Sequence, residues 1–259
     1  MNERPRVEAT PAGWGDLAAE LDRWQACGRV AALWWRDDDA ITATPQLELL
    51  LRVAGGVPVG LAVIPALARP PLAAAVSGEA QLAVLQHGWQ HADRAGNGKK
   101  SEYPQGRSAA VVRAEIGAGS ARLKALFGRR ALPVFVPPWN RFGGGLVPLL
   151  AEQGIVALSA MASGPCRALP AGLRTLDVHL DLVAWRGSRG FIGTAVALAG
   201  LVGLLRARRL AAAAAPGPIG ILTHHRIIDG ATAKFLDRLI ALTRAHAAVR
   251  WAAAAEFIR

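Results

Sequence analysis

The sequence contains very little cysteine, since only Cys27 and Cys166 occur among its 259 residues. Two cysteines cannot form the disulfide framework of a small secreted domain, so we expect both to be reduced and to pack in the interior. The first residues, Met-Asn-Glu-Arg-Pro-Arg-Val-Glu, have no apolar region behind their charges. A secretory signal is therefore not predicted, and the cytoplasm is the expected location.

Long apolar runs are also lacking, because the most apolar stretch, 190–205, is glycine-rich and ends at Arg206. A membrane-spanning helix needs about 20 apolar residues, so we expect no membrane span and instead a helix packed on the domain. Acidic residues are outnumbered, with 19 Asp and Glu against 30 Lys and Arg, for a net charge of +11. The basic residues are scattered and not interleaved with aromatic residues, so binding to nucleic acid is not predicted.

Short β-rich runs alternate with longer helical patterns along the chain. A hydrophobic content of 52% over this length fits one α/β domain, 30–259, preceded by a helical extension, 1–29. The expected strands are 30–35, 57–64, 82–86, 133–136, 155–159, 173–181, 219–223 and 249–251, and the expected helices are 44–54, 108–127, 145–153, 191–210 and 231–246. This alternation predicts a parallel sheet, either closed as a barrel or open and doubly wound.

Polar residues follow four of the predicted strands, each directly at the strand's end. These clusters are Arg36-Asp37-Asp38-Asp39, His87 with His91, Pro137-Pro138-Trp139-Asn140-Arg141, and His224-His225. In barrels of alternating strands and helices, catalytic side chains gather at the carboxyl ends of the strands. We therefore expect the four clusters to meet on one rim.

His87 and His91 are spaced as two ligands of one metal ion could be. If the chain turns into helical geometry after its strand, residues four apart lie on one face and both imidazoles can bind the same ion. A carboxylate from another strand end would complete a site with two histidines and one acid, with positions left for water and substrate. The run Asp37 to Asp39 can supply that carboxylate.

Taken in order, the motifs Asp-Asp, His-x-x-x-His, Pro-aromatic, Asp…Trp and Leu-x-His resemble those of the polysaccharide deacetylase family. These carbohydrate esterases of family four include chitin and peptidoglycan deacetylases. The resemblance covers about 30–257, which is nearly the whole chain. It implies an α/β fold of the irregular (β/α)7-type barrel, polysaccharide deacetylase-like.

The family's Thr-Phe-Asp-Asp-Gly motif resembles residues 36–40 of this chain. In that register the resemblance implies that Asp38 is the general base and Asp39 a metal ligand. A shift by one residue would instead assign these roles to Asp37 and Asp38, and both registers stay open here. His87 and His91 match the family's histidine ligands, so a divalent metal, with Zn²⁺ expected, is implied as the cofactor.

The family's Arg-x-Pro-Tyr motif resembles residues 136–139, which keep the proline, Pro138, and the aromatic residue, Trp139, but have no arginine. That arginine orients the base in the family, and Arg36 or Arg141 could supply the guanidinium here. The backbone N–H of Trp139 matches the family's oxyanion donor. We also expect Trp89, between the two histidines, to line the pocket.

Leu222-Thr223-His224 resembles the family's last motif, which makes His224 the implied general acid. Residues 177–181 with Trp185 resemble the fourth motif loosely, and Asp177 or Asp181 could hold the imidazole of His224. The implied function is metal-dependent hydrolysis of an N-acetyl or O-acetyl group on a carbohydrate. A related metal-dependent hydrolase of a small amide and a catalytically degenerate glycan-binding barrel are the alternatives, the latter because of the missing arginine.

Overall fold

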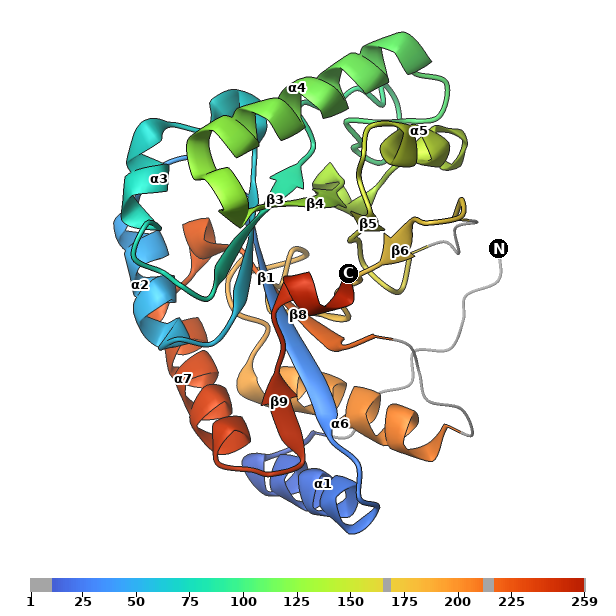
Figure 1. Cartoon of the computed structure of the whole chain (residues 1–259). Coiled ribbons are helices and arrows are strands. Elements are labelled where there is room, and N and C mark those ends of the chain that lie inside the picture. The colour runs from blue at the N-terminus through green and yellow to red at the C-terminus, as the bar shows by residue number, and fades with distance from the viewer. Residues whose placement is uncertain (1–10, 165–168, 212–216, 259) are drawn as a thin grey trace.

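A parallel β-sheet surrounded by helices forms the body of the molecule (Figure 1). The computed structural model describes residues 11–164, 169–211 and 217–258. The strands are β1 (Ala31–Ala40), β2 (Val59–Val63), β3 (Leu82–His87), β4 (Ala131–Val136), β5 (Ala157–Leu158), β6 (Arg174–Thr175), β7 (Leu180–Asp181), β8 (Ile219–Thr223) and β9 (Val249–Trp251). Their order in the sheet is β6-β5-β4-β3-β2-β1-β8-β7, and β9 pairs with the start of β1.

The sheet closes on itself through the stretch 174–181, which contains both β6 and β7. β6 pairs with β5, β7 pairs with β8, and a bridge between Met161 and Val178 lies between these two pairings. The indole Nε1 of Trp34 on β1 also donates to the carbonyl of Asp177 in this stretch, at 3.0 Å. Counting 174–181 as one position, seven strands surround the interior, so the expected (β/α)7-type barrel is confirmed.

Two hydrophobic layers result because most of the barrel strands, such as β2, β3 and β8, are buried on both faces, whereas both residues of β6 are exposed. Inside the barrel, side chains from every strand position pack together: Trp34, Ala62, Leu85, Val134, Val136, Ala157, Leu176, Val178 and Leu222. Outside it, a larger cluster fills the space between the sheet and the helices, and it includes Trp35. Trp34 and Trp35 are thus both buried, on opposite faces of β1.

The outer layer contains α1 (Trp14–Ala26), α2 (Pro45–Ala54), α3 (Pro70–Ala75), α4 (Ala109–Phe127), α5 (Val147–Glu152), α6 (Thr194–Leu210) and α7 (Gly230–Arg244). The start of α2 shows why such helices form where they do: Pro45 occupies its first turn, and the side chain of Thr44 accepts the N–H of Leu47 at 3.1 Å. α1 packs against α6, and the indole of Trp24 donates to the carbonyl of Leu205 at 3.2 Å. In the described part of the chain no helix combines the length and the apolar character needed to cross a membrane.

The expectation that both cysteines pack in the interior is wrong for Cys27. This residue caps the end of α1 and is exposed, because the helix ends at the surface. Cys166 lies outside the described residues.

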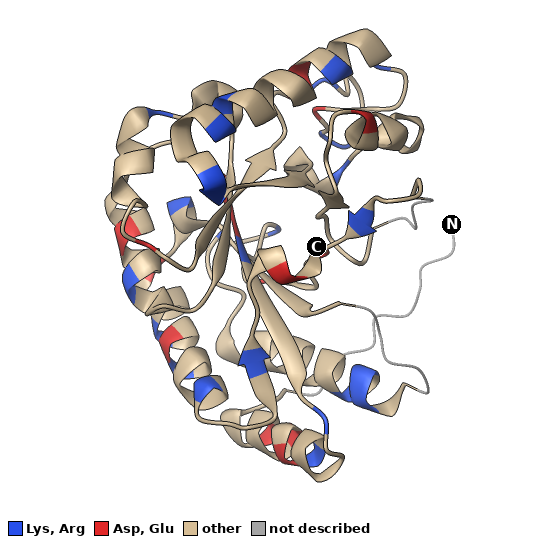
Figure 2. Cartoon of the chain, in the orientation of Figure 1, with Lys and Arg blue, Asp and Glu red and all other residues tan. Residues whose placement is uncertain are grey.

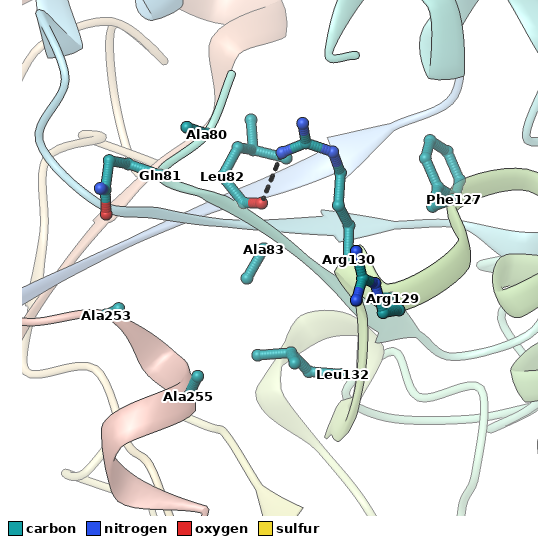
Figure 3. A pocket seen from close by; sticks show the side chains of 10 residues that line it. All are labelled: Ala80, Gln81, Leu82, Ala83, Phe127, Arg129, Arg130, Leu132, Ala253 and Ala255. Carbon is teal, nitrogen blue, oxygen red and sulfur yellow. Dashed lines mark hydrogen bonds between the residues drawn. The ribbon is translucent and has the colours of Figure 1, made fainter. Parts of the chain in front are cut away.

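The amino end of the barrel carries a hollow of about 510 Å³ at the starts of β3 and β4 (Figure 3). Its lining includes Gln81, Leu82, Arg129 and Arg130. The Arg130 guanidinium is occupied by backbone carbonyls, among them that of Leu82 at 3.4 Å. This hollow brings no acidic, histidine or cysteine side chains together, whereas the opposite end of the barrel does.

Candidate metal centre and active site

Asp39, His87 and His91 come together at the carboxyl end of the barrel, and their ligand atoms all lie within 4.8 Å of one another. Oδ1 of Asp39 is 3.1 Å from Nε2 of His87 and 3.4 Å from Nε2 of His91. Ligands about 2.1 Å from a shared ion lie about 3.0 Å apart at right angles and about 3.4 Å apart in a tetrahedron. The spacing of the three side chains therefore fits a small divalent cation.

The hydrogen bonding of His87 supports the same fit. Its Nδ1 lies 3.0 Å from the carbonyl of Val136, which can only accept, so Nδ1 carries the proton and Nε2 of the neutral ring has a lone pair. That lone pair faces the carboxylate oxygen of Asp39 at 3.1 Å. Two acceptors in this position require a proton or a cation between them.

The charges of the three groups are strongly coupled. Burial disfavours ionisation of Asp39, but the hydrogen bond and charge of His87, with the charges of His224 and His91, hold the pKa of the Asp39 carboxyl below its usual range. Burial acts against the charged form of His87 as well, yet the negative charges of Asp38 and Asp39 raise its pKa. Burial and the charge of His87 lower the pKa of His91, which favours the neutral imidazole that binds metal.

The chain between the two histidines is a loop, so the expected helical turn is wrong. Gly88 has φ +58 and His91 has φ +57, both in the left-handed region. A Cβ on Gly88 would clash with Oε2 of Glu102, and φ is positive there, so glycine is required. The buried Glu102 carboxylate accepts the N–H groups of Trp89 and Gln90 at 3.1 and 2.8 Å and holds the loop in place.

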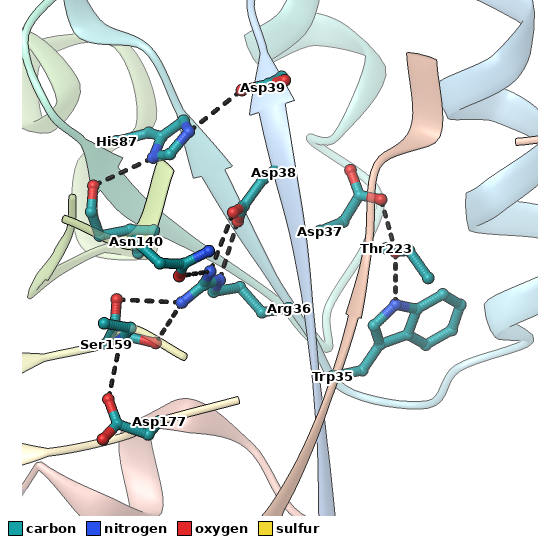
Figure 4. Close-up of polar contacts among 12 residues, drawn as sticks. Trp35, Arg36, Asp37, Asp38, Asp39, His87, Asn140, Ser159, Asp177 and Thr223 are labelled. Carbon is teal, nitrogen blue, oxygen red and sulfur yellow. Dashed lines mark hydrogen bonds and ion pairs between the residues drawn. The ribbon is translucent and has the colours of Figure 1, made fainter. Parts of the chain in front are cut away.

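Asp38 lies beside this site and is held by Arg36, two residues earlier on the same face of β1 (Figure 4). The fully buried guanidinium donates from Nε to Oδ1 and from Nη2 to Oδ2 of Asp38, both at 2.9 Å. It also donates to the carbonyl and hydroxyl of Ser159, at 3.0 and 2.8 Å, and to Oδ1 of Asn140 at 2.8 Å. Arg36 therefore holds both oxygens of the Asp38 carboxylate and is itself held by Ser159 and Asn140.

Arg141, the other candidate for that position, is exposed and donates to the carbonyl of Lys100 at 2.9 Å. Asp37 lies on the opposite face of β1, where it accepts the hydroxyl of Thr223 at 2.6 Å and contacts Nδ1 of His225 at 2.5 Å. The structure thus brings Asp38 and Asp39 to the site and leaves Asp37 outside it. Of the two registers considered, the geometry favours the one that uses Asp38 and Asp39.

His224 follows β8 and faces the same site as Asp38 and Asp39. Its ring meets the edge of the Trp185 ring, with centroids 4.7 Å apart, and Asp181 is near enough for their charges to interact. Nδ1 of His224 is buried without a hydrogen-bond partner among the described residues. The oxygens of Asp181 instead accept the backbone N–H of Val183 at 3.0 Å and the indole N–H of Trp185 at 2.7 Å.

The three possible metal ligands, Asp38 and His224 line one cleft of about 710 Å³. It is lined by Asp38, Asp39, His87, His91, Lys99, Lys100, Trp139, Asn140, Arg141, Met161, Ser163, Gly164, Asp181, Trp185, Arg189 and His224. Trp89 and Pro138 are not among the residues that line it, and Pro138 is buried. The ring of Trp139 instead packs 4.2 Å from the ring of His91.

Backbone strain is concentrated in this cleft. The non-glycine residues with positive φ in the described chain are Asp39, His91, Trp139, Asn140 and Arg189, and every one of them lines it. Such conformations cost about 1–3 kcal/mol each and persist where the surroundings enforce them, which is common at functional sites. The strain therefore marks the same place as the polar side chains do.

Sequence reasoning missed Glu102, Ser159 and the rim residue Arg189, since none belongs to a motif. The spacing of Arg36 and Asp38 did carry a signal, because residues two apart on a strand share a face. Glu102 left no comparable signal, because its role depends on how its loop folds back on Gly88.

No protein-family model matches the sequence, and no curated protein matches it either. Solved structures do match in fold. A protein from Mycobacterium smegmatis assigned as a polysaccharide deacetylase superimposes with a TM-score of 0.64 and 20% identity, over 96% of this chain and 91% of its own. A family 4 acetyl xylan esterase from Clostridium thermocellum, in complex with a cobalt ion, has a TM-score of 0.55 and 15% identity, over 87% and 89%.

A further match is a pseudoenzyme of the same esterase family from Bacillus anthracis, with a TM-score of 0.55 and 14% identity, over 89% of this chain and 66% of its own. At these identities the matches establish the fold. The chain has the fold of the polysaccharide deacetylases.

Proposed function

We propose that this chain is a metal-dependent deacetylase that hydrolyses the N-acetyl or O-acetyl group of a carbohydrate. The observation that carries the proposal is the meeting of three side-chain sets in one cleft. These are the triad Asp39, His87 and His91, the carboxylate of Asp38 held by Arg36, and the imidazole of His224. The shared fold with polysaccharide deacetylases and an acetyl xylan esterase supports it.

Asp39, His87 and His91 would hold the ion, for which Zn²⁺ is expected from their two imidazoles and one carboxylate. A divalent ion bound there would polarise the acyl oxygen and lower the pKa of a bound water. The protein's own part is to fix the ligands: Glu102 holds the histidine loop, and the carbonyl of Val136 sets the tautomer of His87.

Asp38 would act as the general base that takes a proton from the attacking water. Arg36 donates to both carboxylate oxygens of Asp38 at 2.9 Å, which fixes the plane of this carboxylate relative to the triad. Ser159 and Asn140 in turn fix the guanidinium. The base is therefore preorganised by a buried network.

His224 would act as the general acid that protonates the departing amine or alcohol. The backbone N–H of Trp139 would donate to the oxyanion that forms on the acyl carbon. Trp185 is 47% exposed beside His224 and offers an aromatic surface to a sugar ring. The products would be acetate and a free amine or hydroxyl.

The test is acetate release from N-acetylglucosamine oligomers by metal-loaded protein, together with metal content. We expect Asp38→Asn to keep its metal and lose hydrolysis, and His91→Ala to lose both. His246→Gln, at the end of α7 and outside the cleft, is the matched control and should keep both. Full hydrolysis after chelation would contradict the proposal.

The alternative of a glycan-binding barrel without turnover rested on the missing arginine. The contacts of Arg36 with Asp38 support turnover, and binding of the N-acetylglucosamine oligomers without acetate release would support the alternative. A related amide hydrolase remains the rival activity. Product analysis with acetylated sugars against small cyclic amides separates the two, because only the deacetylase releases acetate.

A further inference from the structure

Among the described residues, the exposed charged side chains that line the cleft are all basic. Its exposed charged residues are Lys99, Lys100, Arg141 and Arg189. The acidic residues that line the cleft are instead buried or half-buried at its floor. Basic residues also lie on the outer helices, so the net charge of the protein does not by itself indicate an anionic ligand (Figure 2). The indication comes from the separation of charges within the cleft, with basic residues at the rim and acidic residues at the floor.

The floor carboxylates each have partners other than the rim cations. Asp38 is paired with Arg36, and Asp39 faces the two histidines. Asp181 accepts the N–H groups of Val183 and Trp185, and burial raises the pKa of its carboxyl. Among the described residues, none of the three carboxylates forms an ion pair with a rim cation, and the cations are exposed.

The rim cations themselves have no ion-pair partner among the described residues. Asp93 lies near Lys100 and Arg141, but its carboxylate accepts the N–H groups of Ala95 and Ser101 at 3.0 and 3.2 Å and does not line the cleft. Unpaired lysines and arginines facing a cavity are suited to bind an anionic group.

Three separate connections of the chain carry these four residues. Lys99 and Lys100 lie between β3 and α4, and the guanidinium of Arg141 donates to the carbonyl of Lys100 at 2.9 Å, which joins the loop after β4 to them. Arg189 lies between β7 and α6, which around the barrel is separated from β3 by β4 and β5. Its positive φ of 56°, an unfavourable conformation for arginine, places it on the cleft.

We propose that the substrate is an anionic acetylated carbohydrate, with a carboxylate or phosphate close to the acetyl group that is removed. This inference rests on the proposed function, because it names the substrate class of the same cleft. The acyl group would enter between Asp38 and His224, and the anionic substituent would stay at the rim beside the lysines or Arg189. A neutral acetylated sugar would lose that contact.

The test compares three matched substrates: an N-acetylglucosamine trisaccharide, the same trisaccharide oxidised to a carboxylate at one C6, and the same trisaccharide phosphorylated there. At low ionic strength we expect kcat/KM for one or both anionic forms to exceed that of the neutral form by at least about tenfold. The preference should fall toward unity near 1 M salt, where the screening length is about 3 Å. The two anionic arms distinguish carboxylate from phosphate.

Variants that remove a positive charge show which rim residues cause the preference for anionic substrates. Lys99→Gln with Lys100→Gln, and separately Arg189→Gln, should each lower the ratio of anionic to neutral kcat/KM by about fivefold. The control is Arg52→Gln with Lys124→Gln, on the outer helices α2 and α4 and outside the cleft. It removes the same charge as the lysine pair and should leave the ratio unchanged.

The outcomes separate this inference from the proposed function. Hydrolysis of all three substrates with equal kcat/KM, or a control pair that lowers the ratio as much as the lysine pair, overturns the inference and leaves the deacetylase standing. If none of the three trisaccharides is hydrolysed, the proposed deacetylase function is refuted. In that case tryptophan fluorescence titration with the same three sugars decides the inference, and equal affinity for neutral and anionic forms overturns it.

Discussion

Replacing Arg36 by methionine should destabilise the protein strongly, because it leaves the buried carboxylate of Asp38 without its cationic partner. The Arg36 side chain is 0% exposed and that of Asp38 is 3% exposed, and the two share a pair of 2.9 Å contacts. Removing one partner of such a pair costs about 3–5 kcal/mol, since the remaining charge stays desolvated and unpaired. Arg36→Lys keeps the charge but loses the planar fork, so we expect a smaller loss, about 1–3 kcal/mol.

The matched control is Arg141→Met, on the exposed rim of the same cleft, where the guanidinium donates to the carbonyl of Lys100. Exposed substitutions of this kind change the free energy of unfolding by about 0.5 kcal/mol or less. The double variant Arg36→Met with Asp38→Asn removes both charges and should lose less than the sum of the two single variants.

Urea unfolding measures these differences by linear extrapolation, with the slope checked to be constant across variants. Equal stability of Arg36→Met and Arg141→Met would refute the reasoning. So would strict additivity in the double variant, because it would mean that Arg36 and Asp38 do not act as a pair.

Other substitutions test the histidine loop, the barrel and the effect of acid. Gly88→Ala should lower metal affinity and cost more than about 1 kcal/mol, because its Cβ would strike Glu102 and φ is positive, whereas Gly78→Ala in open space should be near neutral on calorimetry and metal titration. Burial lowers the pKa of His179 to about 4, below its unfolded value, so the unfolded state binds the proton first. Folding stability should therefore fall as the pH drops from about 6.5 to about 4, and His179→Gln should remove this part of the pH dependence of urea unfolding. Trp34→Phe deletes the indole N–H that crosses to the closing strand and should cost about 1 kcal/mol; no loss in the unfolding midpoint would argue against that closure.

Hydrophobic periodicity and turn residues predicted several helices and strands correctly. β8 at 219–223 and β9 at 249–251 match their predicted bounds, and α2 begins behind Thr44 as its capping residue indicates. The barrel closure was harder, because 174–181 changes partners partway along and only long-range pairing reveals it. β1 also runs on to Ala40, through the carboxylates that were expected to follow it.

The sequence predicted which residues form the candidate site, but not the backbone conformation that brings them together. Asp39, His87 and His91 do meet, but through a loop with positive φ at Gly88 and His91, not through a helical turn. Spacing along the sequence cannot reveal a backbone that leaves the usual regions, because that conformation is enforced by Glu102, which lies later in the same connection between β3 and α4. The expectation that Trp89 lines the pocket was wrong, because this residue is not part of the cleft lining.

The most direct measurement is an anomalous difference map from crystals grown with Zn²⁺, recorded above and below the zinc absorption edge. The account predicts one peak at the carboxyl end of the barrel, about 2.0–2.2 Å from a carboxylate oxygen of Asp39 and from Nε2 of His87 and His91. No peak between these three side chains, or a peak only elsewhere on the protein, would contradict it.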